Sequence, residues 1–268
     1  LNTVIGKMSQ VVTDPAEIAQ RRLTPIAPGI DRAFLVEEFN RILVTKTTIA
    51  GFTPGIRVFI EKDDLLPFEE AKLYGHNAIH AMLGFIGTLK GYAKMPELAG
   101  DKALMRVARE AFIRDSGGAL IRKYATLGDD LFTEAGYRVY ADDLLERMTN
   151  PHLADSVARA ARDVVRKLGV NDRIFGTMAL ALEHGIEPKN MAMGALAGVA
   201  LLLANANEYG VPTGCAPYTN SSSLDAVRST HPTGPSRGRP RATARMALED
   251  SDHADPATDH RLYLRRPR

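Results

Sequence analysis

Residues 69–87 read EEAKLYGHNAIHAMLGFIG, a stretch that is apolar enough for a buried helix yet carries several polar side chains. Its interior polar residues are Lys72, His76, Asn77 and His80. Burying a lysine and two histidines is unfavourable unless other groups compensate for the lost hydration. The stretch therefore predicts a helix whose polar side chains do something other than fill a core.

A helical wheel places these polar residues on one side. At 3.6 residues per turn, successive residues are about 100° apart. Relative to Lys72, we expect Glu69, His76 and His80 within about 80° and Asn77 at about 140°. The large apolar residues of the stretch fall on the other side. Gly84 lies on the polar side, where a residue without a side chain leaves room for a ligand or a second backbone.

Three interpretations of this polar stripe compete. It is a solvated face of a half-buried helix, or a metal site, because His76 and His80 have the i, i+4 spacing of zinc ligands on helices. The Lys72 ammonium would repel a cation, and no further ligand is indicated. The third interpretation is a proton-transfer site. A lysine removed from water loses part of its preference for the charged form and can act as a general base, while Asn77 and His80 donate to an oxyanion.

The pattern K-x4-N-x2-H, here Lys72, Asn77 and His80, resembles the signature of the polyol-specific long-chain dehydrogenases and reductases, the mannitol dehydrogenase family. The resemblance implies that the lysine is the catalytic base and that the asparagine and histidine hold the reacting oxygen. It also implies that no metal is used and that hydride passes to NAD. Glu69 is then a possible proton conduit from Lys72 to solvent, or only a carboxylate stabilised in the first turn by the helix dipole.

The resemblance extends over residues 1–212. LIRKYATLGDD, ERMTNPHLADSVARAARDVVRKLGVNDRIFG and LEHGIEPKNMAMGALAG are similar to consecutive helices of the family's C-terminal substrate domain, and are most similar to the mannitol-1-phosphate 5-dehydrogenase branch. The implied fold is mainly α, a multi-helical C-terminal domain of the mannitol dehydrogenase type with a few strands at the N-terminus.

A cluster of basic residues follows in the expected helix 153–168. Arg159, Arg162 and Arg166 fall within about 60° on its wheel, and Lys167 is adjacent. Such a face suits a sugar phosphate, so we assign these four residues, with His76, to substrate binding. The alternative is pairing of the arginines with neighbouring carboxylates, Asp155 and Asp163 among them. The leading substrate pair is mannitol 1-phosphate and fructose 6-phosphate; the alternatives are a free polyol or a hexuronate.

Composition sets further limits. The formal net charge is +2, which does not indicate nucleic acid or a membrane surface as a partner. The single cysteine, Cys215, excludes an internal disulfide and fits a reducing compartment such as the cytoplasm. No apolar run reaches the length of a membrane span.

The order of elements changes once along the chain. We expect strands within residues 1–12 and 55–64. Residues 31–46 could form a strand or a helix, and a strand is favoured at the start of this region. Helices are expected from residue 67 onward, at 67–92, 101–114, 117–127, 133–147, 153–168, 171–184 and 188–207.

The expected domain organisation has two parts. Residues 1–212 form the substrate domain, with 1–66 a strand-containing crossover from a Rossmann domain. That domain, which the resemblance implies binds most of the cofactor, is expected from a longer chain or another chain, since Leu1 is not Met. Residues 213–268 hold nine arginines and no lysine, and we expect a disordered or non-native tail. A truncated, non-catalytic helical module is the alternative function.

Overall fold

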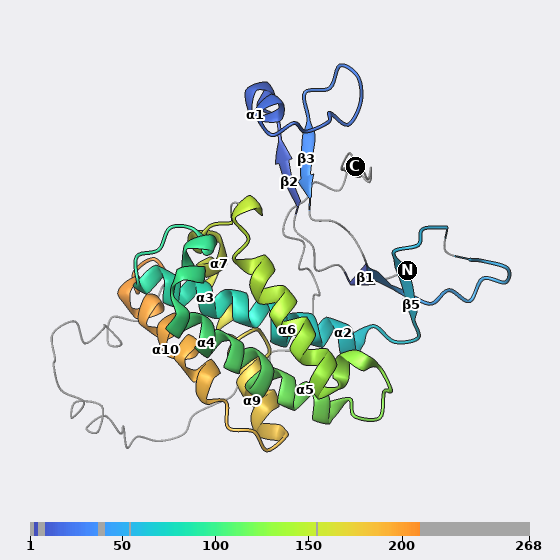
Figure 1. Ribbon diagram of the computed structural model, residues 1–268. Coiled ribbons are helices and arrows are strands. Elements are labelled where there is room, and N and C mark those ends of the chain that lie inside the picture. Colours follow the sequence, from blue (N-terminus) through green and yellow to red (C-terminus); the bar gives the residue numbers. More distant parts are fainter. Residues whose placement is uncertain (1–2, 5–8, 37–40, 54, 154, 210–268) are drawn as a thin grey trace, which may run out of the picture. The chain divides into compact units, whose positions relative to one another are not determined.

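The computed structural model describes residues 3–4, 9–36, 41–53, 55–153 and 155–209 (Figure 1). The expected tail of 213–268 lies outside the described residues. Within them the fold is mainly helical, with the strands confined to positions before residue 66, as the sequence predicted. None of the described helices has both the length and the apolar character required to cross a bilayer.

The described strands are β1 (Thr3–Val4), β2 (Ser9–Val12), β3 (Ala33–Val36), β4 (Ile42–Thr45) and β5 (Phe59–Lys62). β4 pairs with β1 in antiparallel and with β5 in parallel orientation, whereas β2 and β3 form a separate antiparallel ladder. β1, β2, β3 and β5 lie where strands were expected, whereas β4 lies at the end of the region 31–46, of which only the start was expected to be a strand.

A short helix between β2 and β3, α1 (Pro15–Gln20), was not predicted. The Asp14 side chain caps it by accepting a hydrogen bond of 2.9 Å from the backbone N–H of Ala16. Proline at the first helical position adds a second start signal. Ile18 anchors the helix in a small core with Val12, Leu23 and Ala33. The Asp-Pro pair was therefore a readable helix start.

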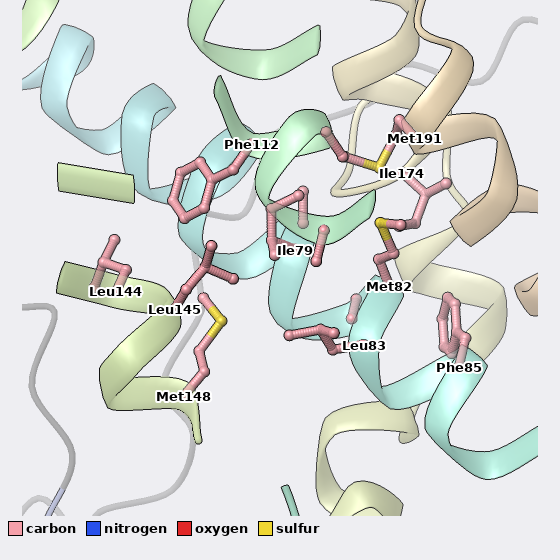
Figure 2. Packing of buried hydrophobic residues seen from close by; sticks show 14 of the residues in the cluster. Ile79, Met82, Leu83, Phe85, Phe112, Leu144, Leu145, Met148, Ile174 and Met191 are labelled. Carbon is pink, nitrogen blue, oxygen red and sulfur yellow. The ribbon is translucent and has the colours of Figure 1, made fainter. Parts of the chain in front are cut away.

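The stretch at 69–87 forms one continuous helix in three segments: α2 (Leu66–Glu70), the π-helix η1 (Ala71–Asn77) and α3 (Ala78–Leu89). Its apolar side is fully buried at Ile79, Met82 and Phe85. Figure 2 shows these side chains packed among those of Phe112, Met191 and residues of α6 (Glu134–Met148). The central helix of the core is thus the one that carries the polar stripe.

A second long helix also contains a π segment: α4 (Lys102–Glu110), η3 (Ala111–Gly117) and α5 (Gly118–Lys123). The prediction of separate helices at 101–114 and 117–127 is wrong. Asp115 and Ser116 lie inside this helix. They do not end it, because their side chains form hydrogen bonds with other helices. Asp115 accepts from the backbone N–H of Met191 at 2.7 Å, and Ser116 bonds to the Tyr137 hydroxyl at 2.9 Å.

The remaining described helical segments follow in chain order. They are η2 (Met95–Gly100), η4 (Asp130–Phe132), α6 (Glu134–Met148), η5 (Pro151–Leu153), α7 (Val157–Ala161), α8 (Val164–Lys167), α9 (Phe175–Glu183) and α10 (Lys189–Ala204). α6, α9 and α10 confirm the helices predicted at 133–147, 171–184 and 188–207.

The single helix predicted at 153–168 is wrong. Ser156 is an N-cap whose side chain accepts from the backbone N–H of Arg159, so α7 begins only at Val157. The chain then leaves the helix at Arg162 (ψ 153°) and turns through Asp163, which has a left-handed φ of 59°. Aspartate tolerates this conformation better than most residues do.

Glycines allow close packing around α3. A Cβ at Gly84 would lie 2.5 Å from the carbonyl carbon of Ala160, and one at Gly194 would lie 2.8 Å from Cγ of Met82. α7 and α10 therefore approach α3 closely through these two positions. The expected role of Gly84 in admitting a second backbone is confirmed.

Candidate functional site

The π-helix η1 determines how the polar residues of the stripe are spaced. Ala78 donates its backbone N–H to the carbonyl of Leu73, five residues earlier. This i→i+5 pattern widens the turn beyond that of an α-helix. Residues five apart in a π-helix, such as Lys72 and Asn77, are separated around the helix axis by less than the 140° expected in an α-helix. The position of Asn77 on the uniform wheel is therefore wrong, and the correction moves it toward Lys72.

Gly75 lies in the middle of η1 and packs tightly against two aromatic rings. A Cβ there would lie 2.7 Å from Cε2 of Phe112 and 2.7 Å from the hydroxyl of Tyr137. The Tyr137 ring also lies against η3, since a Cβ at Gly117 would be 2.6 Å from its Cδ1. Both π segments are thus fitted around the same buried tyrosine.

The polar stripe is partly buried at Lys72, His76, Asn77 and His80. Burial lowers the pKa of His76 well below its usual value, and the charges of His80, Arg147, Lys72 and Arg159 add to this effect. These four groups therefore lie within electrostatic range of His76. We refer to Lys72, His76, His80, Arg147 and Arg159 as the basic cluster. At neutral pH its His76 is uncharged.

Lys72 and Asn77 differ from His80 in how their side chains are used. Among the residues that the structure describes, the Lys72 amine and the Asn77 amide make no hydrogen bond or ion pair. His80 instead donates from Nε2 to Oδ2 of Asp155 at 2.9 Å. The two stripe residues with the highest hydrogen-bonding capacity are therefore the ones available to a ligand.

Asp155 is the acidic partner of the cluster. Arg159 donates to it twice, from Nε to Oδ1 and from Nη2 to Oδ2, both at 2.6 Å. Burial alone would raise the pKa of Asp155, but the hydrogen bonds from His80 and Arg159 hold it well below the usual range. The carboxylate thus stays ionised between an imidazole and a guanidinium.

Lys167 is buried at the end of α8. Its amine donates to the carbonyl of Ala160 at 3.2 Å. Burial lowers the pKa of Lys167 to about 8, assisted by the charge of Arg173. Its own charge acts on His80, whose pKa is lowered, mainly by burial. The structure therefore places Lys167 and Arg159 near His80.

Arg162 and Arg166 act on Lys167 through their charges, but they pair with another carboxylate than Asp155. Both pair with Asp163, at 3.6 and 3.3 Å, and their side chains are 60% and 45% exposed. The predicted single face of three arginines is wrong because the helix breaks at Arg162. Of these three predicted arginines, only Arg159 belongs to the basic cluster.

Glu69 lies in the first turn of α2 and is partly buried. This position agrees with stabilisation by the helix dipole. The adjacent Glu70 has a structural use, because it accepts from the Lys123 amine at 2.7 Å and from the Tyr124 hydroxyl at 2.7 Å.

No group of three or more His, Cys, Asp or Glu in the described part of the chain is arranged to hold a metal ion.

The analysis of the sequence missed the contact between His80 and Asp155. The two residues are 75 positions apart, and no pattern in the sequence joins them. Asp155 was considered only as an alternative partner for the arginines, a pairing indicated by its i, i+4 spacing to Arg159. Arg147 was missed altogether; it lies on α6, where its spacing from Asp143 indicated only a surface ion pair.

Together these features define a mainly helical domain with a basic cluster on its central helix. Residues 64–216 match the family described as mannitol dehydrogenase C-terminal domain. Because the match spans more than half of the sequence, the chain belongs to the mannitol dehydrogenase C-terminal domain family. The predicted fold class is confirmed.

Two solved structures share this fold. One is a D-sorbitol dehydrogenase in substrate-free form, with a TM-score of 0.60 and 22% identity, covering 75% of this chain and 39% of that chain. The other is mannitol 2-dehydrogenase of Pseudomonas fluorescens in a ternary complex with NAD and D-mannitol. It has a TM-score of 0.52 and 23% identity, covering 75% of this chain and 38% of that chain. The chain thus corresponds to less than half of each of these proteins.

Proposed function

We propose that this chain is the substrate-binding and catalytic part of an NAD-dependent polyol dehydrogenase. Lys72 takes the proton of the alcohol, Asn77 donates to the oxygen as it becomes a carbonyl, and hydride passes to NAD. The cofactor is held mainly by a Rossmann domain outside these residues, which residues 1–66 connect to the substrate domain. Glu69 is the proposed route for the proton from Lys72 to solvent.

The basic cluster is the observation that carries this proposal. Its cationic groups favour the negative charge that develops on an alcohol oxygen as its proton leaves. Lys72 and Asn77, which η1 brings toward one line, have no competing partner among the described residues. A base and an amide aimed at the same oxygen need this proximity.

The arrangement of the arginines favours an unphosphorylated substrate. Arg162 and Arg166 are exposed and paired with Asp163, and Arg159 is bonded twice to Asp155. A phosphate would have to displace these carboxylates. We therefore propose a free polyol or a hexuronate in place of mannitol 1-phosphate, with His76, Arg159 and Lys167 near the substrate. The names of both structural relatives refer to free polyols.

The test uses a protein that contains these residues together with the family's nucleotide-binding domain. NADH formation is measured with mannitol, sorbitol and mannitol 1-phosphate, and NADH consumption with fructuronate and tagaturonate. We expect turnover of at least one unphosphorylated substrate. Activity with mannitol 1-phosphate alone would overturn the substrate class, and inactivity with the whole panel would favour a non-catalytic module.

Lys72→Ala should lower kcat in this protein by about 10²-fold or more, the scale of a lost general base. Lys102→Ala is the matched control, because the Lys102 amine is exposed and bonds only to the carbonyl of Ala99 among the described residues. The control should retain full turnover, and an added small amine should restore part of the activity of Lys72→Ala. Equal kcat in both variants would contradict the role of Lys72.

A further inference from the structure

The carboxylate of Asp155 joins two residues of the basic cluster. It receives one hydrogen bond from His80 Nε2 and two from the Arg159 guanidinium. Its side chain is only 4% exposed. A buried carboxylate with three donors is held in one orientation, because any rotation would leave a charged oxygen without a partner.

Backbone hydrogen bonds also hold Asp155 and its neighbours in place. The carbonyl of Asp155 accepts from the N–H of Met95, and the N–H of Val157 donates to the carbonyl of Ala93, both at 3.0 Å. Ser156, between them, caps α7. The carboxylate is therefore held beside His80 by contacts within the chain itself.

This contact determines which nitrogen of His80 carries the proton. An ionised carboxylate can only accept, so the nitrogen that faces it, Nε2, must be the protonated one. Burial lowers the pKa of His80, so the ring is neutral at pH 7 and above. In a neutral imidazole the other nitrogen, Nδ1, then has a free lone pair and accepts hydrogen bonds.

We propose that Asp155 is a positioning residue that holds His80 in the Nε2-protonated tautomer, so that Nδ1 accepts a hydrogen bond from a substrate hydroxyl. The substrate part of this inference rests on the proposed function. It changes the role expected for His80, because a neutral His80 bonded to Asp155 cannot donate to the reacting oxygen. That donation falls to Asn77, and His80 instead selects for a hydroxyl group next to the reacting carbon.

The charged groups that act on His80 are known from the structure. Asp155 favours the protonated ring, whereas Arg159 and Lys167 oppose it, and His76 on η1 lies within electrostatic range. Because two permanent or near-permanent cations oppose one carboxylate, loss of Arg159 should make His80 easier to protonate. This separates the effect of the carboxylate from that of the guanidinium.

The first test is ¹⁵N NMR of the histidine rings in the chain as it is, without substrate or NAD. The His80 signals are assigned by their loss in His80→Gln. We expect the Nε2-protonated form above pH 7 in the wild-type chain. In Asp155→Asn the amide can either accept from or donate to the ring, so the single tautomer should give way to a mixture. A wild-type Nδ1-protonated ring would overturn the inference, and so would an unchanged tautomer in Asp155→Asn.

Two variants serve as controls. Arg159→Gln keeps the carboxylate, so the tautomer should persist while His80 titrates at higher pH. Asp163→Asn removes a carboxylate that pairs with Arg162 and Arg166 but does not contact His80, so the His80 signals should not change. If Asp155→Asn does not fold, the wild-type spectrum and Arg159→Gln still decide the question.

The second test uses the longer protein with its nucleotide-binding domain. Asp155→Asn should raise KM for the polyol at least tenfold. A substrate analogue that lacks the hydroxyl next to the reacting carbon should lose the same factor in the wild type and nothing further in the variant. Equal penalties for the analogue in both proteins would overturn the role of Nδ1. The NMR result does not depend on turnover, so failure of the proposed dehydrogenase activity is distinguishable from failure of the tautomer assignment.

Discussion

His76 shows how a single residue of the cluster makes stability depend on pH. Its pKa is lowered well below 6.5 in the folded chain, by burial first and then by neighbouring positive charges. The unfolded chain therefore binds a proton that the folded chain does not, once the pH falls below about 6.5. Stability conferred by the neutral ring is present above this pH and is lost as the pH falls toward the folded pKa. His80 acts in the same direction.

We predict that His76→Gln flattens this dependence. In urea unfolding at pH 7.5, 6.5 and 5.5, the wild-type free energy of unfolding should fall by up to about 1.4 kcal/mol per pH unit for each such histidine. In His76→Gln the free energy of unfolding should fall less steeply with decreasing pH, because the contribution of one histidine is removed. Replacement of His152 by Gln is the control, because His152 is exposed. A variant with the full wild-type slope would show that His76 is protonated in the folded state.

At neutral pH the buried Lys167 lowers the stability of the fold, in contrast to the two neutral histidines. Its pKa is about 8 in the folded chain against 10.5 when unfolded. Below pH 8 both states are charged, and the folded state bears the full cost of burying the ammonium. Between pH 8 and about 10.5 only the unfolded state keeps the proton, so wild-type stability rises with pH in this window.

Lys167→Met should therefore stabilise the chain at pH 7, by about 1–2 kcal/mol once the lost hydrogen bond to Ala160 is subtracted. The gain relative to wild type should shrink between pH 8 and 10. Thermal melts of both proteins across this range measure the difference directly. A variant that is less stable than wild type at pH 7 would contradict the prediction. Such a gain is the expected signature of a residue retained for function.

At the scale of elements, the contact between α3 and α7 depends on Gly84. A Cβ at this position would lie 2.5 Å from the carbonyl carbon and 2.7 Å from the oxygen of Ala160. Both helices belong to the core, so neither can move without loss of packing. His80, one turn earlier on α3, and Asp155, just before α7, would be displaced with them.

Gly84→Ala should therefore destabilise the fold by about 1–3 kcal/mol or more, despite the higher helix propensity of alanine. Gly100→Ala is the matched control, because nothing lies within 4 Å of a Cβ there. Its free energy of unfolding should stay within about 1 kcal/mol of wild type. Urea unfolding of the two variants distinguishes the cases, and equal midpoints would mean that α7 adjusts to the extra methyl group.

Elements with strong local signals were predicted well. The apolar period and the capping residues located α6, α9 and α10, and the β-branched runs located the strands. The errors lie where tertiary contacts override local pattern. Asp115 and Ser116 resemble a helix end until their buried partners on α10 and α6 are known. The break at Arg162–Asp163 has no proline or glycine to announce it.

For the whole molecule, the fold followed from the sequence more completely than the site did. A polar stripe on a buried helix identified which residues face one space, because side-chain direction repeats along a helix. The same pattern could not show that Asp155 meets His80, since that contact requires α7 to cross α3 at Gly84. Nor could it show η1, because a π-helical turn has no distinct composition. The predicted arginine face was wrong because the helix expected to carry it breaks at Arg162 and Asp163.

The π-helix η1 also affects how this chain should be aligned with its relatives. A relative that lacks one residue between positions 71 and 77 could form a regular α-helix with the same ends. Residues beyond the deletion would then keep their faces, because the π turn accommodates the extra residue, but each would stand one position nearer to the lysine in the sequence. An alignment that forbids gaps inside helices would therefore pair residues that occupy different faces. Homologues should therefore be aligned here with a single-residue gap allowed. The positions equivalent to the lysine and to the asparagine should be assigned separately.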